Sequence, residues 1–427
     1  MAEIDPTVVA HVAEIATDAR TASRQLALLS RAAKDEVLLA LADALEVATP
    51  TIVAANAADL RRGRDRDLAV GLLDRLMLDE ARIAAIAGAV RDIAGLPDPV
   101  GEVVRGGTLA NGLEIRQVRV PIGVIGMIYE ARPNVTVDAA ALCLKSGNAV
   151  ILRGGSAAGA TNLAIVTAIR DALVAQGISA YAVSLLDEGG HDAARALMTA
   201  RGLVDLVIPR GGADLIQTVV RESTVPVIET GIGVNHVYVD AAADLDSALA
   251  IVLNSKTQRP SVCNAAESLL VHESVAEAFL PKVLAELGSA GVTTHAGGEV
   301  SEFADAAGAA YGIATDADFG TEWHGLEINV RVVPDLDAAL SHVRTFGTQH
   351  TEVIVTQDRA AARRFTSEVD AAVVMVNASS RFTDGGEFGF GAEIGISTQK
   401  LHARGPMALP ELTTTKWIVE GDGQLRT

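Results

Sequence analysis

Cysteine and aromatic residues are scarce in this chain of 427 residues. Two cysteines cannot form a disulfide framework, so we expect a reducing compartment. Aromatic residues make up only 3% of the chain, so its core must be built mainly from alanine, valine, leucine and isoleucine. The length predicts two or three domains.

The chain also lacks an excess of basic residues, a long apolar run and paired metal ligands. The formal net charge of −19 argues against nucleic acid or an anionic membrane as the main partner. No apolar run approaches the roughly 18 residues of a membrane span, and the N-terminus is acidic where a signal peptide is basic. The nine histidines show no metal-ligand spacing, so we expect no metal. A cytoplasmic protein is predicted.

The hydrophobic pattern predicts an α/β protein. Charges at helical spacing predict amphipathic helices over residues 7–95, and an Asn-Gly pair within residues 102–119 predicts a hairpin. Short apolar runs ending in glycine then alternate with helical segments, which is typical of a parallel sheet. A second alternating set begins near residue 235 and predicts a second lobe. The apolar runs before it lie at 147–155, 204–212 and 225–233.

Each of these three runs ends in glycines. In open α/β sheets, ligands bind just beyond the carboxyl ends of the strands, where these glycines are expected to lie. None of the stretches is a full G-x-G-x-x-G motif, and each alone could be a plain turn. Arg153 and Arg210 directly precede Gly-Gly pairs. Arginine and exposed backbone N–H groups bind phosphate, so the set indicates a phosphate-bearing ligand.

The two cysteines have different sequence settings. Cys143 lies in an Ala/Leu-rich helical segment, which favours a buried structural thiol. Cys263 follows Lys256 and Arg259, and nearby cations lower a thiol pKa. Composition alone leaves open whether Cys263 is a core residue or a nucleophile. No local signature of a Cys-His protease is present.

Two further polar motifs also keep alternatives open. Asn134 follows a proline at a strand-to-helix junction, where it could cap the helix or direct its amide at a carbonyl oxygen. His342 and His350 are expected to be structural or surface residues rather than ligands.

Several long stretches together resemble one family. The chain is similar over nearly its whole length to the gamma-glutamyl phosphate reductase family, within the aldehyde dehydrogenase superfamily. Phe346 stands where that family usually has His or Tyr, and Val234–Asn235 stands where Asn-Cys is common. The matching stretches are 119–156, 258–272, 333–355, 388–407 and 411–419.

The resemblance implies a catalytic set. Cys263 matches the catalytic cysteine and Asn134 the asparagine that stabilises the oxyanion. Glu229, 34 residues before Cys263, matches the glutamate that is the base in aldehyde-oxidising relatives.

The resemblance also implies NADPH as cofactor. Arg153 stands where relatives have a ribose-binding lysine, and Ser156 where NAD-using relatives often have a carboxylate. Gly211 and Gly212 match the cofactor-side turn, and Glu322 matches the acid that holds the nicotinamide ribose.

Anion-binding residues are needed for an acyl phosphate that also carries a carboxylate, and arginine suits such contacts. A structural ion pair is the alternative for each basic candidate. The substrate-binding candidates are Arg132, Lys145, Arg259, Arg381 and His236.

The implied fold is aldehyde dehydrogenase-like. A Rossmann-like cofactor domain is expected at 1–101 and 120–235, and an α/β catalytic domain at 236–395. A small β oligomerisation flap is expected at 102–119 and 405–420, with a dimer or tetramer as the assembly.

The implied reaction is NADPH-dependent reduction of L-glutamate 5-phosphate to L-glutamate 5-semialdehyde through a cysteine thioester, in proline biosynthesis. A phosphate-independent semialdehyde dehydrogenase of the same superfamily is the alternative, and a non-catalytic binding or scaffold protein is a second. A transient contact with glutamate 5-kinase is plausible, because acyl phosphates are labile in water.

Overall fold

The computed structural model describes residues 4–68, 70–130, 132–308 and 311–426. The chain divides into two compact units. Unit 1 comprises residues 1–230, 389–395 and 407–427, and unit 2 comprises residues 231–388 and 396–406. Each unit contains a parallel sheet, so the two predicted α/β lobes are confirmed.

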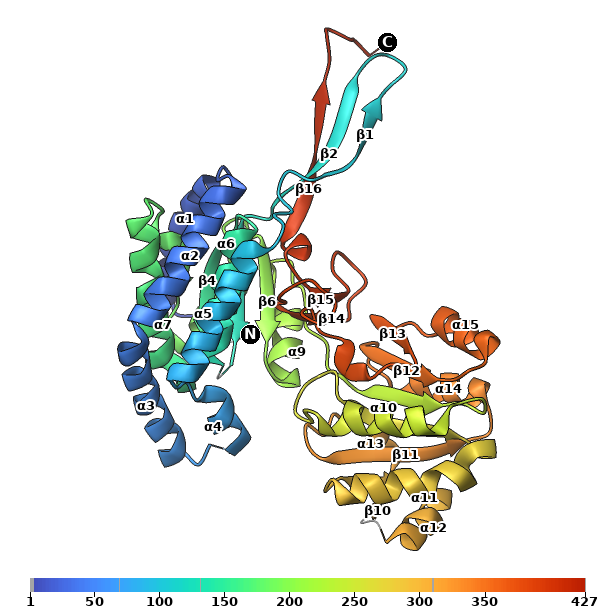
Figure 1. The fold of residues 1–427 in the computed structure, drawn as a ribbon. Helices are drawn as coiled ribbons and strands as arrows, with labels where there is room; N and C mark the ends of the chain where they lie inside the picture. Colours follow the sequence, from blue (N-terminus) through green and yellow to red (C-terminus); the bar gives the residue numbers. More distant parts are fainter. Residues whose placement is uncertain (1–3, 69, 131, 309–310, 427) are drawn as a thin grey trace. The chain divides into compact units, whose positions relative to one another are not determined.

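The sheet of unit 1 has four parallel strands in the order β5-β4-β3-β6 (Figure 1). All six residues of β3 are buried, as expected for a parallel strand covered on both faces. The strands are β3 (Val124–Tyr129), β4 (Ala149–Gly154), β5 (Val183–Leu185) and β6 (Leu206–Arg210).

Helices pack on this sheet in two groups. α1 and α8 contact each other and β3, whereas α6 and α7 contact each other and the sheet. The predicted helices of residues 7–95 are confirmed as α1–α5. The helices of unit 1 are α1 (Pro6–Leu26), α2 (Arg31–Val47), α3 (Thr49–Asp65), α4 (Val70–Leu76), α5 (Glu80–Gly95), α6 (Pro133–Lys145), α7 (Gly159–Ala175), α8 (Gly190–Thr199) and α9 (Ala213–Glu222), with the 3₁₀ turns η1 (Ser156–Ala158), η2 (Ala180–Ala182) and η4 (Pro410–Leu412).

One described segment, η1 with α7, is long and apolar enough to be tested as a membrane span. Half of it is buried inside the structure, and α7 packs against α2 and α3. These contacts are those of a core helix.

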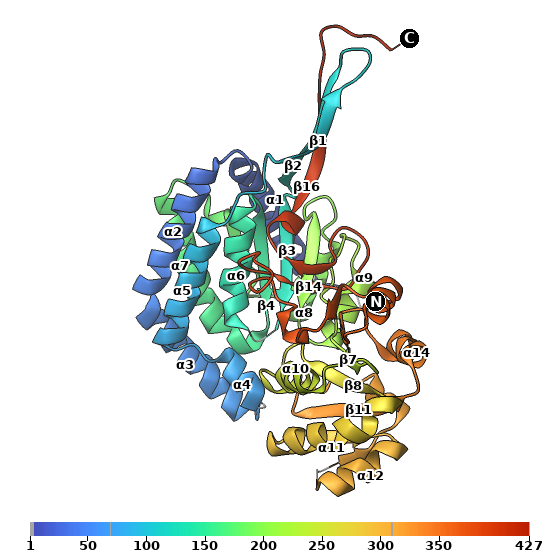
Figure 2. The same cartoon turned by 45° about the vertical axis from the view of Figure 1, so that its right-hand side comes forward.

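A separate three-stranded antiparallel sheet belongs to unit 1 and extends away from the rest of that unit (Figures 1 and 2). It consists of β1 (Val103–Thr108), β2 (Glu114–Pro121) and β16 (Thr413–Glu420), with β2 in the centre. Gly112 in the β1–β2 turn has φ +84°, a conformation that favours glycine. The predicted hairpin and late strand are therefore confirmed.

The sheet of unit 2 has seven strands in the order β10-β9-β11-β8-β7-β12-β13, and its described pairings are parallel. The strands are β7 (Asn235–Val239), β8 (Ala266–His272), β9 (Thr293–Ala296), β10 (Tyr311–Ile313), β11 (Glu327–Val333), β12 (Thr351–Val355) and β13 (Val373–Val376). The helices are α10 (Leu245–Thr257), α11 (Glu273–Ser289), α12 (Gly298–Ala307), α13 (Asp316–Phe319), α14 (Leu336–Phe346) and α15 (Arg359–Glu368), with the 3₁₀ turn η3 (Ser380–Phe382).

Alternate residues of the central strands build two cores. Val237 and Leu269 pack with residues of α10 and α11. Their neighbours Tyr238 and Leu270 pack with residues of α14 and α15. Helices therefore cover both faces of this sheet, because successive side chains of a strand point to opposite faces.

The prediction of a strand at residues 225–233 is wrong. This segment makes a single bridge, Val207↔Val227, with backbone bonds from Val207 to Pro226 and from Ile228 to Val207. Pro226 has no N–H with which to extend the pairing. Two short strands, β14 (Gly395–Ser397) and β15 (Gly405–Met407), complete the fold, and each contains one of the four unit boundaries.

Candidate active site

Cys263 lies in the turn of residues 258–265, which joins α10 to β8 in unit 2. Cys263 is half-buried, whereas Cys143 is fully buried in α6. Burial raises the pKa of the Cys143 thiol above its ordinary value. The prediction of a buried structural Cys143 is confirmed, and of the two thiols the one in the turn is suited to react.

Asn264 ties this turn to η3. Its side-chain Nδ2 donates to the backbone carbonyl of Thr383 at 2.8 Å. Its backbone carbonyl accepts from the Ser380 hydroxyl at 2.6 Å. The residue is 3% exposed, so these bonds are shielded from water. Arg381 lies between Ser380 and Thr383 and is thereby placed next to the turn.

A buried ion pair closes the base of the turn. Lys256 Nζ at the end of α10 lies 2.7 Å from Glu267 Oε2 at the start of β8, and both side chains are fully buried. Burial, with a smaller contribution from the nearby Glu322 carboxylate, raises the pKa of Glu267 to about 8, although Lys256 opposes the shift. The pair fixes the two ends of the segment that carries Cys263.

Glu322 lies on the other side of the same region. Its Oε1 accepts from the backbone N–H of Gly233 at 3.1 Å, and its Oε2 lies 3.3 Å from His324 Nε2. A side-chain carbon at Gly233 would overlap the Cys263 carbonyl, so the two backbones are in close contact. Glu322 therefore contacts Gly233, and Gly233 lies directly against Cys263.

Two arginines gather beside the turn. Arg381 is half-buried and its Nε donates to Gln258 Oε1 at 2.8 Å. Burial lowers the pKa of Arg381, and the exposed Arg259 lowers it further, whereas Asp384 and the Cys263 thiolate raise it. A cavity of about 240 Å³ is lined by Gln258 and Arg381 together with two acidic residues, so its lining is not purely basic.

In unit 1 the first turn of α6 carries Asn134. This exposed residue donates from Nδ2 to Asp138 Oδ2 at 3.2 Å, and no side chain caps α6. Burial raises the pKa of Asp138 to about 6, although the Asn134 bond and Arg210 oppose the shift. Arg132 precedes Pro133 as the N-cap residue and is half-buried. Asn134 is therefore not the cap, which was one of its two interpretations.

The carboxyl ends of β4 and β6 in unit 1 carry the predicted cofactor residues. Arg153 donates to the carbonyl of Gly190, at 3.2 Å from Nε and 2.8 Å from Nη2, at the start of α8. The N–H of Gly212 at the start of α9 donates to Glu130 Oε2 at 2.9 Å. A side-chain carbon at Gly211 would lie 2.7 Å from the same oxygen. The amide at this helix start therefore already binds a carboxylate oxygen.

Ser156 and Glu229 complete the predicted residues of unit 1. Ser156 is exposed at the start of η1, directly beyond β4. Glu229 is half-buried in the segment that follows the single bridge at Val227.

Lys145 and His236 have structural partners. Lys145 is fully buried at the end of α6, where Nζ donates to the Ala94 carbonyl at 2.6 Å and pairs with Asp35. His236 is fully buried, and its Nδ1 lies 2.9 Å from Glu352 Oε2. These contacts favour the structural alternative for both residues.

His342 and His350 are also buried, at 5% and 0% exposure. His342 packs edge-on to His236, and burial lowers the pKa of His342 to about 3. Their placement agrees with the structural role expected from sequence. No cluster of three or more potential metal ligands occurs among the described residues.

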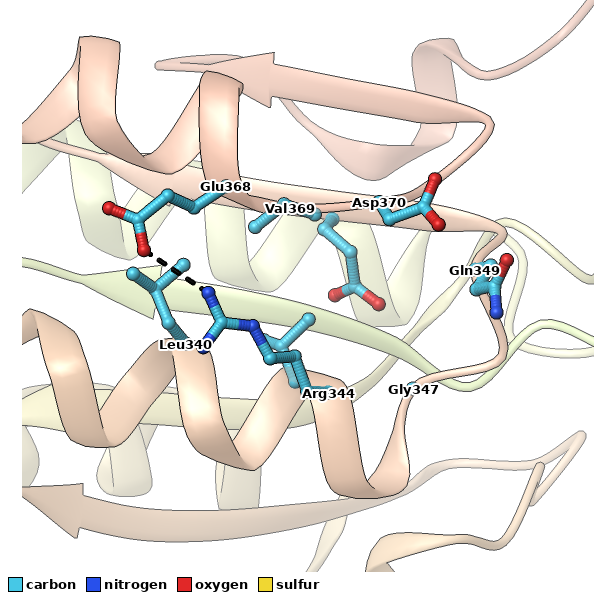
Figure 3. A pocket seen from close by; sticks show the side chains of 9 residues that line it. Leu340, Arg344, Gly347, Gln349, Glu368, Val369 and Asp370 are labelled. Atoms are coloured by element: carbon cyan, nitrogen blue, oxygen red, sulfur yellow. Dashed lines mark hydrogen bonds and ion pairs between the residues drawn. The ribbon is translucent and has the colours of Figure 1, made fainter.

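A further pocket of about 270 Å³ lies between α14, α15 and β12 (Figure 3). Arg344 and Glu368 form an ion pair across it, at 3.1 Å. Asp370 at its rim is paired with Lys400 and Arg404. The lining contains none of the predicted site residues, and its charges are balanced locally.

Three residues of the site were not assigned roles from the sequence. They are Asn235, Glu267 and Asn264, which bond to the turn or close its base. A buried acid such as Glu267 in an apolar strand was the available signal, because such residues are rarely buried without a partner.

Comparison with known proteins places the chain in a class. The model of the "Aldehyde dehydrogenase family" matches residues 1–299. An acetylating aldehyde dehydrogenase from Geobacillus thermoglucosidasius shares the fold, with a TM-score of 0.70 and 16% identity over 100% of both chains.

More similar relatives are gamma-glutamyl phosphate reductases. One from Thermobifida fusca is 61% identical over 97% of this chain and 98% of its own. One from Kineococcus radiotolerans is 59% identical over 98% and 97%. The crystal structure of the Thermotoga maritima protein has a TM-score of 0.94 and 44% identity, and covers 97% of this chain and 100% of its own. The chain belongs to the aldehyde dehydrogenase family and, within it, to the gamma-glutamyl phosphate reductases.

Proposed function

We propose that this protein reduces L-glutamate 5-phosphate to L-glutamate 5-semialdehyde and phosphate, with NADPH as reductant, in proline biosynthesis. The observation that carries the proposal is the 61% identity with a gamma-glutamyl phosphate reductase over nearly the whole of both chains. The half-buried Cys263, in a turn held at several points, supplies the chemical centre for the reaction.

Cys263 acts as the nucleophile. Its thiolate attacks the acyl carbon, the carbon–sulfur bond forms, and the carbon–oxygen bond to phosphate breaks. Asn134 donates to the oxyanion that develops on the acyl oxygen. Cys263 is regenerated as a thiolate when the aldehyde leaves.

Arg381 and Arg259 are proposed to hold the departing phosphate. Arg259 and the Cys263 thiolate both act electrostatically on Arg381, so the two guanidinium groups and the thiol lie near one another. Arginine also matches phosphate oxygens with parallel hydrogen bonds. Arg132, which precedes the helix that carries Asn134, is proposed to bind a carboxylate of the substrate.

The residues of unit 1 fit a phosphate-bearing dinucleotide. The Gly212 amide binds a carboxylate oxygen of Glu130, which shows that this helix start accepts an anionic oxygen. Gly211 and Gly212 would hold the phosphates, and Arg153 and Ser156 the 2′-phosphate. Glu322, a residue of unit 2, is proposed to hold the nicotinamide ribose. When bound, NADPH supplies the hydride that reduces the acyl group.

Glu229 is proposed to have a non-basic role. A reductase must keep water away from its thioester, and a strong water-activating base would promote hydrolysis. Glu229 would then act as a hydrogen-bonding group or assist only in proton transfer.

The β1–β2–β16 sheet is proposed as the oligomerisation flap of a dimer or tetramer. Val103, Val104, Trp417 and Val419 are exposed on it, which leaves apolar surface for a second copy to cover. We also propose that the enzyme is cytoplasmic and contacts glutamate 5-kinase transiently, since its substrate is labile in water.

The reverse reaction tests the activity. NADP⁺ reduction with glutamate semialdehyde should require phosphate, or arsenate in its place. Phosphate-independent turnover would instead identify a semialdehyde dehydrogenase.

Cofactor preference has a separate test. Ser156→Asp should lower kcat/KM with NADPH by about tenfold or more and affect NADH little, because the carboxylate would repel a 2′-phosphate. Ser289→Asp, an exposed serine at the end of α11, is the matched control and should change neither value. An unchanged NADPH preference in Ser156→Asp would refute the assignment of Ser156.

A further inference from the structure

Asn235 makes three hydrogen bonds around the Cys263 turn. It is the first residue of β7 and is fully buried. Its Nδ2 donates to the carbonyls of Cys263 and Ala265, both at 2.7 Å. Its Oδ1 accepts from the N–H of Thr351 at 3.1 Å. The side-chain amide thus uses both of its donors and one acceptor, and this pattern fixes which atom is oxygen and which is nitrogen.

These bonds replace the sheet where regular pairing stops. Strand pairing between β7 and β8 begins at Asn235↔Ala266 and is irregular at the next residue. Residues 263–265 therefore lie just outside the sheet ladder. The Asn235 side-chain amide donates to two of their carbonyls, in place of the backbone N–H groups that a continued ladder would supply.

Successive carbonyls of the turn are held from different elements. The Cys263 carbonyl is bound by Asn235 on β7, and the next carbonyl, that of Asn264, is bound by Ser380 of η3. Holding two consecutive peptide groups restricts the rotation of the backbone at Cys263 and Asn264. The direction of the Cα–Cβ bond of Cys263, and with it the placement of the thiol, follows from that backbone.

Close backbone approach supports the same role. Gly233 allows the segment before β7 to lie directly against the Cys263 carbonyl, because any side-chain carbon there would overlap it. The Thr348 hydroxyl in turn accepts from the N–H of Val234 at 3.0 Å and donates to the Ile232 carbonyl at 2.5 Å. The segment that bears Asn235 is therefore itself fixed.

We infer that Asn235 is a positioning residue for the Cys263 nucleophile. Its carboxamide sets the orientation of the Cys263 and Ala265 peptide groups and thereby the placement of the thiol for attack. This inference rests on the proposed function in that Cys263 is taken as the nucleophile.

The test compares Asn235→Ala with Asn56→Ala. Asn56 in unit 1 is also fully buried and has the same pattern of bonds, with Nδ2 donating to the Leu76 carbonyl at 2.8 Å and Oδ1 accepting from Leu78 N–H at 2.8 Å. Its Nδ2 has a second acceptor in the Thr161 hydroxyl at 3.2 Å. Loss of either amide should destabilise the fold, but only Asn235 touches the turn.

Three quantities are measured on the folded full-length chain, below the unfolding transition of each variant. They are kcat, KM for NADPH, and the rate of Cys263 alkylation by iodoacetamide as a function of pH. We expect Asn235→Ala to lower kcat at least tenfold, to change KM for NADPH less than threefold, and to alter the alkylation rate or its midpoint pH. We expect Asn56→Ala to leave all three within about twofold.

Asn235→Ser provides a second variant should Asn235→Ala not fold. A serine hydroxyl can serve one carbonyl at most, so its kcat should lie between the wild type and Asn235→Ala, or below the wild type where the alanine variant cannot be measured. Wild-type values of kcat and alkylation in the folded Asn235 variants would overturn the inference, as would equal losses in Asn56→Ala. Full activity in Cys263→Ala would instead overturn the proposed function, so the two failures are distinguishable.

Discussion

The surroundings of the two cysteines differ in kind, although each region contains a fully buried lysine. Cys143 lies within α6 among apolar side chains, and Lys145 nearby is held by Asp35 and the Ala94 carbonyl. Cys263 lies in an irregular turn, and Lys256 pairs with Glu267 across its base. Apolar packing makes one thiol inert, whereas polar side chains hold the other at a half-buried position.

The helix α6 itself contains both kinds of surroundings. Its first turns carry Asn134 and Asp138, and its last turns carry Cys143 and Lys145. Parallel strands lead into helices at one edge of the sheet, so ligands meet helix starts there and not helix ends. Position along the element, and not only residue type, separates function from packing.

Exchange of each cysteine gives the largest expected effect. Cys263→Ala should lower kcat by at least about 10³-fold, because no other described group supplies the nucleophile. Cys143→Ala should leave kcat within about twofold and lower the free energy of unfolding by about 1 kcal/mol. Steady-state rates and urea denaturation measure the two.

Alkylation followed by peptide mass analysis provides the control for that pair. Iodoacetamide should label Cys263 in the folded protein and Cys143 only after unfolding, because burial keeps the Cys143 thiol protonated. Labelling of Cys143 in the folded protein would remove the distinction between the two regions.

Exchange of the two buried lysines sharpens the comparison. Lys256→Met leaves Glu267 fully buried without its partner and should cost about 3–5 kcal/mol of unfolding free energy. Lys145→Met removes the buried partner of Asp35, but the Asp35 side chain is 27% exposed and can be hydrated. The loss of unfolding free energy in this variant should therefore be smaller, about 1–2 kcal/mol. Urea denaturation of both variants measures the difference.

Only the first of these variants should affect the thiol. Lys256→Met frees the base of the turn and should slow alkylation of Cys263 severalfold, whereas Lys145→Met should not. Equal alkylation rates in the two folded variants would show that the ion pair does not support the turn.

The start of α6 should show a pH dependence that its end lacks. Burial raises the pKa of Asp138 to about 6 from an ordinary value of 3.8, so the folded state binds more protons than the unfolded state between these values. The contribution of Asp138 to stability is therefore present below about pH 4 and is lost as pH rises to 6, by at most about 3 kcal/mol.

Asp138→Asn provides the measurement. The unfolding free energy of the wild type minus that of the variant should fall between pH 4 and 7. A difference independent of pH would show that Asp138 has no raised pKa in the folded protein.

Exchange of Glu229 has the smallest expected effect. Glu229→Gln should lower kcat of the reductase no more than a few-fold, because hydride reduction needs no activated water. Steady-state kinetics checks this, beside Cys263→Ala as the reference. A loss as large as that of Cys263→Ala would refute the non-basic role of Glu229.

Much of the fold could be predicted from local pattern. The helices of residues 7–95, the Asn-Gly hairpin and both parallel lobes follow from hydrophobic periodicity and turn residues. The segment at 225–233 was mispredicted, because its apolar residues fit a strand while Pro226 and the path of the chain limit it to one bridge. Periodicity describes which residues are apolar and not which backbone groups find partners.

Candidate site residues could be named from the sequence where a motif carries chemistry. Cys263, Asn134 and the Gly-Gly turns stand out by residue type and position, and they lie at the element junctions that the pattern implied. Lys145 and His236 were candidates because charge and imidazole suggest binding, yet both are fully buried with acidic partners. A sequence does not reveal whether a charged residue has a partner distant in the chain.

The sequence by itself determined the class of fold and the family, because these depend on patterns and motifs along the chain, and it singled out Cys263 as the candidate nucleophile. Only the tertiary structure decided how the turn that carries Cys263 is held. Asn235 meets Cys263 across 28 residues, Asn264 meets Thr383 across 119, and Lys145 meets Asp35 across 110. Such pairs form only after the strands and helices have packed. Those made by Asn235 and Asn264 fix the conformation of the turn that carries Cys263.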